Sequence, residues 1–315
     1  MSDILTITLN PAFDVSTSVG TVEPGPKLRC DQPRYDPGGG GVNVSRAISR
    51  LGGVSAAFVA LGGQTGAMFH SLLDAEDFEV TQFEIEGNTR QSLAVLENST
   101  KKQYRFQLPG PVWSPAQTAS MLKHLRQHLS PGRVVVMSGS LPPGMQADIA
   151  STVNRLAVES GSLLMLDTSG AALTAASKNP GPPFALLRMD GAEATEVSGR
   201  TFASPADLAD YGLELIREGV ANQLVMSMGS TGTVGVSANE RFFCQPPKIE
   251  TLSAIGAGDS MVAAIALELS RGASLKGAVR HGVAAAGSAV LTPATELCSK
   301  TVADEILEKV VTAEI

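Results

Sequence analysis

Short apolar segments alternate with longer amphipathic segments along most of the chain. The apolar segments are rich in β-branched and aliphatic residues, and they cover residues 4–9, 56–61, 133–139, 162–168, 184–189 and 222–228. Amphipathic segments of helix length lie between or after them, as at residues 115–128 and 205–219. This alternation is typical of βαβ units. The pattern therefore predicts an α/β fold with a mainly parallel central sheet.

Two regions depart from this rhythm. Residues from about 15 to 35 and from about 90 to 107 alternate between polar and apolar positions with no helix between the expected strands. They are either edge hairpins or a small separate β-lid. Near-continuous helix is expected at the end of the chain, over residues 257–269, 274–291 and 302–315. No internal repeat or low-complexity linker divides the sequence, so residues 1–315 are expected to form a single domain.

Composition and charge limit the classes of partner. The 315 residues carry a net charge of −7, and a concentrated positive field is what a nucleic-acid or membrane surface requires. We therefore expect neither partner. The three cysteines have no CxxC spacing, so free thiols are expected. Because no secretory signal or apolar stretch of about 18 residues is present, the sequence predicts a cytoplasmic protein.

A turn of small residues precedes one of the expected helices. Gly256, Ala257 and Gly258 lead into Asp259, and the apolar run that follows favours a helix. The first amides of a helix have no intrahelical partner and attract anions, so a phosphoryl group could approach here. Asp259 has two interpretations at this stage. It is either an acid that caps the helix or a general base that takes a proton from a substrate hydroxyl.

A second glycine-rich stretch and a set of basic residues also suggest a binding site. Four glycines at positions 38–41 lead into an amphipathic helix whose first turn carries Asn43, an amide that could bind a polyol. The stretch lacks the GK[ST] of a P-loop and does not match GxGxxG. Among the basic residues of the two β regions, four are candidates for binding a ligand: Lys27, Arg29, Arg90 and Arg105. They are either solvated charges at strand edges or a set that converges on an anionic substrate.

Taken together, the motifs carry a family resemblance over nearly the whole chain. ITLNPAFD, PGGGGVNVSRA, YRFQLPG, SGSLPPG, LDTSG, SMGSTG and GAGDSM occur in this order. The sequence resembles the ribokinase-type carbohydrate kinases, and within them the phosphofructokinase branch. The resemblance implies a three-layer ribokinase-like fold with a small β-lid at about residues 15–35 and 90–107. It also implies a homodimer, because this lid often serves as a dimer clasp in the group.

The resemblance implies an activity as well. Such an enzyme would transfer the γ-phosphoryl group of Mg·ATP to the 1-hydroxyl of fructose 6-phosphate, giving fructose 1,6-bisphosphate. Fructose 1-phosphate and tagatose 6-phosphate are alternative acceptors. A sugar-phosphate or nucleotide sensor that has lost activity is an alternative of another class.

The family's site residues transfer onto matching positions of this sequence. Asp259 would be the catalytic base, with the anion hole formed by Gly256, Ala257 and Gly258. The sugar phosphate would be held by Asp14, Lys27, Arg29, Gly39, Gly40, Asn43, Arg90, Arg105 and Ser140. The nucleotide would be bound by Arg188, Asp190, Ser227, Gly229, Gly232, Thr251, Val283 and Gly287.

Two stretches depart from the family pattern. Where the family has Lys-Pro-Asn-x-x-Glu, this chain has Arg188, Met189, Asp190 and then Glu193. The two carboxylates, Glu193 and Asp190, would organise Mg²⁺ through water, and Asp190 brings extra negative charge to the site. Residues 291–299 replace an Asn-Gln-Gly-Thr-Arg run that is linked to monovalent-cation binding. The changed residues there leave K⁺ activation open.

Overall fold

Ten strands in the described residues (3–178, 181–293 and 296–315) form the central sheet of the computed structural model. Their order is β14-β13-β12-β11-β10-β9-β8-β1-β4-β5. The strands are β1 (Ile4–Thr8), β4 (Ala56–Leu61), β5 (Glu79–Glu84), β8 (Val134–Ser138), β9 (Leu163–Asp167), β10 (Leu186–Asp190), β11 (Gln223–Ser227), β12 (Thr233–Ser237), β13 (Arg241–Gln245) and β14 (Val311–Glu314). From β11 to β5 all neighbours are parallel, whereas β12, β13 and β14 add antiparallel pairs at one edge. The prediction of a mainly parallel sheet is confirmed.

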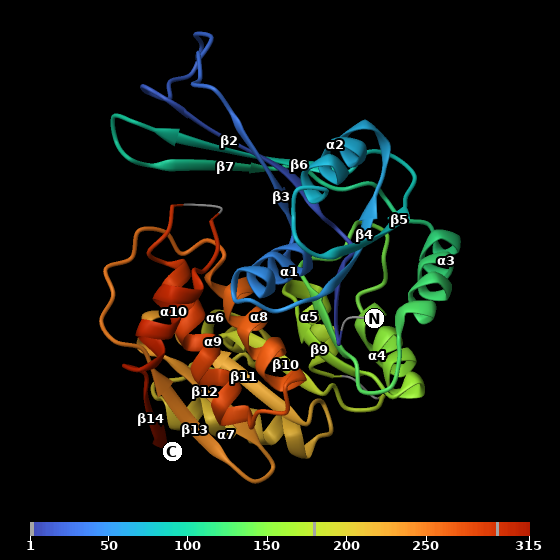
Figure 1. The fold of residues 1–315 in the computed structure, drawn as a ribbon, viewed down its shortest axis with the longest axis vertical. Helices are drawn as coiled ribbons and strands as arrows, with labels where there is room; N and C mark the ends of the chain where they lie inside the picture. Colours follow the sequence, from blue (N-terminus) through green and yellow to red (C-terminus); the bar gives the residue numbers. More distant parts are fainter. Residues whose placement is uncertain (1–2, 179–180, 294–295) are drawn as a thin grey trace.

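Helices cover both faces of this sheet, which gives three layers (Figure 1). Strand β8 shows why: Val135 and Met137 pack into one helical layer, and Val134 and Val136 into the other. Parallel strands that are buried on both faces read as continuous apolar runs, as the sequence does here. The first layer contains α3 (Pro115–Leu125), the 3₁₀ turn η1 (Arg126–His128), α4 (Ile149–Ser160), α5 (Gly170–Ala176), α6 (Gly191–Ser198) and α7 (Pro205–Arg217).

The second layer lies on the opposite face and includes the helix predicted after the small-residue turn. It contains α1 (Gly40–Arg50), α8 (Ala257–Ser270), α9 (Leu275–Ala289) and α10 (Lys300–Leu307). A further helix, α2 (Gly63–Leu73), packs its Phe69 and Leu73 against β4 and against Phe13. None of the helices in the described ranges is both long enough and apolar enough to cross a lipid bilayer.

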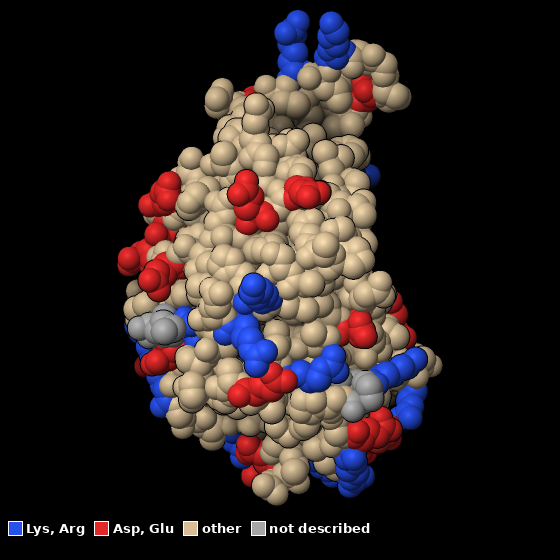
Figure 2. All heavy atoms as spheres, turned by 90° about the vertical axis from the view of Figure 1, so that its right-hand side faces the viewer, with Lys and Arg blue, Asp and Glu red and all other residues tan. Residues whose placement is uncertain are grey.

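A second sheet of four strands extends away from the helical layers (Figure 1). Its order is β3-β2-β6-β7, with β2 (Ala12–Val19), β3 (Arg34–Gly38), β6 (Arg90–Glu97) and β7 (Gln103–Gln107). Strands β2 and β6 are parallel, and the other two pairs are antiparallel. The two β regions of the sequence thus form one separate sheet, and they are not edge hairpins of the central sheet. Basic side chains stand at the outer end of this extension (Figure 2).

The C-terminal helix ends earlier than the sequence predicted. Helix α10 stops at Leu307, and the chain then forms β14, which pairs antiparallel with β13. The expectation of helix from residue 302 to the C-terminus is therefore confirmed as far as Leu307 and wrong beyond it. Val311 and Thr312 are β-branched residues that favour strand, and the pairing satisfies backbone groups along the edge of β13. A distant strand supplies this partner, so the local sequence pattern could not reveal it.

Candidate active site

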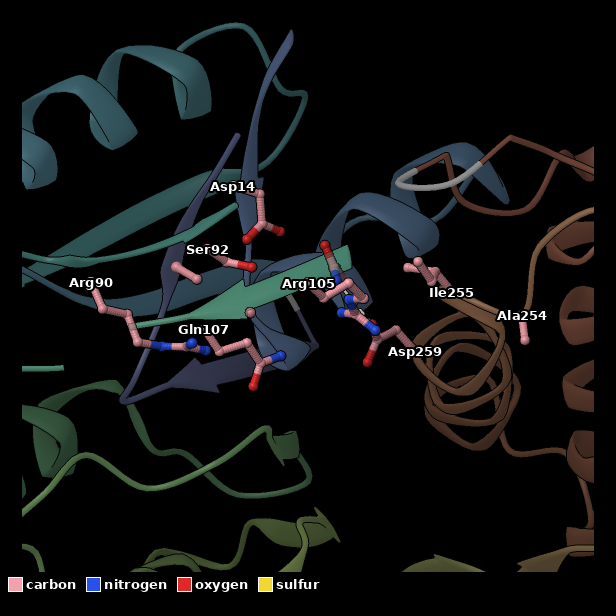
Figure 3. Close-up of a pocket in the computed structure, with 12 residues that line it drawn as sticks. Asp14, Arg90, Ser92, Arg105, Gln107, Ala254, Ile255 and Asp259 are labelled. Atoms are coloured by element: carbon pink, nitrogen blue, oxygen red, sulfur yellow. Dashed lines mark hydrogen bonds between the residues drawn. The ribbon is translucent and has the colours of Figure 1, made fainter. Parts of the chain in front are cut away.

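A pocket of about 400 Å³ separates the four-stranded sheet from the first turn of α8. Figure 3 shows Asp14, Ser92 and Arg90 on the sheet side of this pocket, with Asp259 on the α8 side. The lining residues are Ala12, Asp14, Gly39, Asn43, Arg90, Ser92, Arg105, Gln107, Ala254, Ile255, Gly256 and Asp259. The pocket thus joins segments from the first, second and last thirds of the chain.

Strand register explains why polar side chains gather on one face of the small sheet. Residues aligned across paired strands point to the same side, and successive residues point to opposite sides. One aligned row runs from β3 to β7 through Asp36, Asp14, Ser92 and Gln107, and the next row contains Arg34, Ser16, Ala94 and Arg105. Since Asp14, Ser92, Gln107 and Arg105 line the pocket, this polar face is the one that borders it.

Asp14 is a half-buried carboxylate at the centre of this face. Burial raises its pKa to about 6, and the like charge of Asp36 adds to the rise. Arg90, Arg105 and a hydrogen bond from Ser92 lower the pKa in opposition. Asp14 therefore ionises close to neutral pH, and at pH 7 it is an acceptor for hydroxyl groups of a ligand.

Arg90 lies on the same face of the small sheet and lines the pocket. Its Nε donates to the backbone oxygen of Asn10 at 3.2 Å, and its burial lowers the guanidinium pKa, an effect that Asp14 partly offsets. The Asn10 side chain donates in turn to Ser140 Oγ at 3.1 Å. This arrangement leaves the remaining donors of Arg90 for an anionic ligand in the pocket.

Asp259 stands on the opposite wall, in the first turn of α8. The N-cap residue of this helix is Gly256, whose φ of 78° is in the left-handed region, and among the described residues no side chain caps the helix. The Asp259 carboxylate accepts a hydrogen bond from Asn43 Nδ2 at 2.9 Å instead. The interpretation of Asp259 as a helix-capping acid therefore has no support in the structure.

The electrostatic surroundings of Asp259 suit a proton acceptor. Burial raises its pKa to about 6, and the nearby charge of Asp167 adds to the rise, whereas the hydrogen bond from Asn43 and the charge of Arg188 lower it. A base whose pKa lies near the working pH combines a useful ionised fraction with real proton affinity.

The four-glycine run brings Asn43 into position. A Cβ atom on Gly40 would lie 2.3 Å from Ser138 Oγ and 2.7 Å from the backbone nitrogen of Gly139. A Cβ atom on Gly38 would lie 2.1 Å from the carboxylate of Asp14. Only glycine permits these approaches, which place the N-terminus of α1 against the end of β8 and beneath the small sheet. Gly39 lines the pocket, while Gly40 serves this close packing.

A second polar cluster lies behind the first turn of α8, where β9, β10 and β11 end. Arg188 donates to Asp167 Oδ1 at 3.1 Å and to Ser227 Oγ at 3.0 Å, and its guanidinium would contact a Cβ atom on Gly258 at 3.5 Å. Burial lowers the pKa of Arg188, but Asp167 and Glu193 outweigh it, so the net shift is upward. The guanidinium stays charged next to the proposed anion hole.

Asp190 and Glu193 form a reciprocal capping box at the start of α6. The Asp190 side chain accepts the Glu193 N–H at 2.8 Å, and the Glu193 side chain accepts the Asp190 N–H at 2.7 Å. The aspartate that departs from the family pattern therefore caps a helix here. Within the described residues no group of three or more His, Cys, Asp or Glu side chains could hold a metal ion directly. Each carboxylate uses one oxygen in the box, so the pair fits Mg²⁺ that keeps its own water shell.

The remaining residues predicted for the nucleotide do not line the 400 Å³ pocket. Gly229 is in the 3₁₀ turn η2 (Gly229–Thr231), and Gly232, with a φ of 146°, packs tightly against β13. Thr251 is exposed in the loop before α8. Val283 and Gly287 are buried in the packing of α9. Their roles toward ATP stay predictions.

Lys27, Arg29 and Ser140 also lie outside the lining of the pocket. Lys27 and Arg29 are exposed in the segment that joins β2 to β3. Residues 294–295, which fall within the stretch linked to K⁺, lie outside the described residues, so the K⁺ expectation stays a prediction.

The comparison with known families gives a clear result. Residues 5–302 match the pfkB family carbohydrate kinases. The chain belongs to the pfkB family. Its ribokinase-like architecture and the order of its motifs agree with this assignment, so the predicted family and fold are both confirmed.

Named members of the pfkB family are similar over nearly the full length. The chain is 41% identical over 307 residues to the ATP-dependent 6-phosphofructokinase isozyme 2 of Mycobacterium tuberculosis H37Rv, covering 97% of this chain and 89% of that protein. It is 32% identical over 267 residues to the 1-phosphofructokinase of Xanthomonas campestris, with 84% and 83% covered. The crystal structure of phosphofructokinase-2 from Escherichia coli with fructose 6-phosphate superposes with a TM-score of 0.90 at 35% identity, covering 98% and 99%.

Ser92 and Gln107 line the pocket but were not found by sequence reasoning. Both residues belong to the aligned row that contains Asp14. The signal that could have found them is strand register, since the residue opposite a predicted site aspartate shares its face. That register depends on pairing between β2 and β6, which are far apart in the sequence.

Proposed function

We propose that this protein transfers the γ-phosphoryl group of ATP to the 1-hydroxyl of fructose 6-phosphate. One observation carries the proposal: Asp259, at the N-terminus of α8, shares a single pocket with Asn43, Asp14, Arg90 and Arg105. A general base, an anion-binding helix end and a polar sugar-binding face thus converge in one place. Since both substrates are cytoplasmic metabolites, we place the protein in the cytoplasm.

The two arginines would bind the phosphate that the sugar already carries. Arg90 and Arg105 lie on the small sheet and provide planar donors that match phosphate geometry. Asp14 and Asn43 would bind sugar hydroxyls. This arrangement would hold the sugar with one hydroxyl directed toward Asp259, which supplies proximity and orientation for the transfer.

Phosphoryl transfer then requires little covalent work from the protein. Asp259 would accept the proton of the 1-hydroxyl as that oxygen attacks the γ-phosphorus, and the bond from this phosphorus to the β–γ bridging oxygen would break to release ADP. The backbone amides of Gly256, Ala257 and Gly258 would stabilise the charge on the transferred group. Transfer at O1 yields fructose 1,6-bisphosphate.

The cluster at the ends of β9, β10 and β11 would serve the nucleotide. Arg188, next to Gly258, would pair with the phosphates of ATP. Asp190 and Glu193 would hold Mg²⁺ through water, and Mg²⁺ would supply charge neutralisation of the triphosphate. Ser227 fixes the Arg188 guanidinium in place.

We propose further that the four-stranded sheet is a lid that closes the pocket and carries the contacts of a homodimer. Its outer face, opposite the polar rows, exposes Tyr35, Leu93, Phe106 and Leu108, with exposed fractions between 38% and 54%. Apolar side chains gathered on one face favour association. In such a dimer the exposed Lys27 and Arg29 could reach a sugar phosphate.

Size-exclusion chromatography with light scattering tests the dimer. F106E is expected to yield monomers, because it places a charge in the centre of the apolar face. L163E is the matched control, because Leu163 is equally exposed, at 52%, but starts β9 on the central sheet. Loss of the dimer in both variants, or in neither, would count against the lid as the interface.

Steady-state kinetics with Mg·ATP test the function. Values of kcat/KM are measured for fructose 6-phosphate, fructose 1-phosphate and tagatose 6-phosphate, and fructose 6-phosphate is expected to give the highest. A preference for fructose 1-phosphate would reassign the protein to the activity named for the Xanthomonas relative. Binding of a sugar phosphate without any transfer would instead indicate a sensor.

A further inference from the structure

Arg34 makes an ion pair at the border of the small sheet that no step described above uses. Its Nε lies 2.9 Å from Asp36 Oδ2 and its Nη2 lies 3.0 Å from Asp36 Oδ1, so the guanidinium engages both carboxylate oxygens. The Asp36 side chain is 8% exposed and that of Arg34 is 46% exposed. A longer contact of 3.5 Å joins Arg34 Nη1 to Glu296, which is also exposed. Of the two acids that Arg34 contacts, only Asp36 is buried.

Asp36 is the cross-strand neighbour of Asp14. The antiparallel pairing of β2 with β3 places the two residues directly opposite each other, so their side chains share the face that borders the pocket. Like charges in this relation repel. The other groups that act on Asp14 are Arg90, Arg105 and the Ser92 hydroxyl.

We propose that Arg34 is a positioning residue of the sugar-phosphate site, which offsets part of the charge of Asp36 so that Asp14 can bind the sugar as a carboxylate. Arg34 itself does not line the pocket and acts through Asp36. The inference rests on the proposed function, in which Asp14 accepts hydrogen bonds from sugar hydroxyls.

Two properties distinguish this pair from an ordinary surface ion pair. Exposed pairs contribute little because both partners are solvated. Asp36, by contrast, is buried, and Arg34 is a cation that engages both of its carboxylate oxygens, so breaking this pair removes positive charge from beside a buried acid. The nearest acidic neighbour in the row is Asp14, whose pKa burial already raises to about 6. A further rise would increase the fraction of Asp14 that is protonated at neutral pH.

The test is the pH dependence of KM for fructose 6-phosphate, measured from pH 5 to 9. R34Q is expected to shift the acidic limb of the pH profile of 1/KM to higher pH by about one unit. The reason is that the positive charge of Arg34 no longer offsets the negative charge of Asp36, which raises the pKa of Asp14. The KM would rise about threefold at pH 6.5, and it would converge with the wild-type value above about pH 8. The kcat at saturation would change less than about twofold.

Companion variants identify the route of the effect. D36N in the R34Q background removes the like charge and is expected to return the limb to the wild-type position or below it. R34K, which keeps a positive charge, is expected to recover most of the wild-type profile. R200Q is the control, because Arg200 is about as exposed as Arg34 but pairs with the exposed Glu214, outside the pocket lining. Its limb is expected to stay at the wild-type position.

Two results would overturn the inference: an unmoved limb in R34Q, or a double variant R34Q/D36N as impaired as R34Q alone. The latter would mean that Arg34 acts on the fold and not through Asp36. Wild-type protein without turnover on any of the three sugars refutes the proposed function separately. In that case calorimetric titration with fructose 6-phosphate measures the same limb in the binding constant, and the two failures stay distinguishable.

Discussion

Replacing Asp259 with asparagine should stabilise the folded protein while it removes activity. The pKa of this carboxyl is raised from 3.8 to about 6, first by burial and then by Asp167. The folded state therefore disfavours the ionised form that the reaction needs. Asparagine removes the charge, and its side-chain oxygen can still accept the hydrogen bond that Asn43 donates at 2.9 Å.

The size of the effect follows from the shift in pKa. A rise of about two pKa units corresponds to about 3 kcal/mol of unfolding free energy at pH 7.5, since one unit is about 1.4 kcal/mol. The folded pKa lies above the unfolded pKa of this acid, so the folded state binds the proton more tightly. The cost of ionisation consequently grows as pH rises through the window from about 4 to 6. At pH 5 the difference between the two proteins should fall to about half of this value, and near pH 4 to less than about 1 kcal/mol.

Urea unfolding of both proteins at pH 7.5 and pH 5 measures these differences. D74N is a matched control, because the Asp74 side chain is 71% exposed and is removed from the pocket. Its unfolding free energy should change by less than about 0.5 kcal/mol at either pH. A D259N variant that is no more stable than wild type at pH 7.5, or whose advantage does not shrink at pH 5, would refute the reasoning.

Three further predictions follow from the geometry of the site. The value of kcat/KM should fall as pH drops through about 6, because Asp14 and Asp259 must both be ionised and each has a pKa raised to about 6; a flat pH–rate profile between pH 5 and 8 would contradict this. G38A should raise the KM for the sugar at least about tenfold or prevent folding, since its Cβ would meet the Asp14 carboxylate, whereas G20A has open space and should behave as wild type in the same kinetic assay. R188Q should raise the KM for ATP and lower the unfolding free energy by about 3 kcal/mol, because it removes the cation that pairs with the largely buried Asp167 carboxylate; R188K should lose less of both because it keeps the charge, and losses equal to those of R188Q would contradict a role for that charge.

The central sheet could be predicted because its signal is local. The parallel strands β1, β4, β8, β9, β10 and β11 are runs of apolar residues that two helical layers bury, and such runs stand out in the sequence. Asp259 and Asn43 could be found for a related reason. Each follows a turn of small residues at the start of a helix, and the need for close backbone approach restricts those turns to glycine or alanine.

The parts that escaped prediction depend on contacts between distant segments. Ser92 and Gln107 reach the pocket only through the register of β6 against β2 and β7. The C-terminal strand forms because Val311 and its neighbours meet the free edge of β13. The proposed role of the ion pair between Arg34 and Asp36 likewise depends on the opposite strand, where Asp14 lies. The periodicity of a strand does not reveal which other strand it pairs with, or in which register.

The most direct test of the account compares wild-type protein and D259N in the formation of fructose 1,6-bisphosphate at saturating Mg·ATP and fructose 6-phosphate. Calorimetry on the same preparations measures sugar binding. We predict that the wild type forms the bisphosphate, and that D259N turns over at least about 100-fold more slowly while binding the sugar within a few-fold of the wild-type Kd. Turnover by D259N within about tenfold of wild type would contradict the assignment of this carboxylate as the proton acceptor.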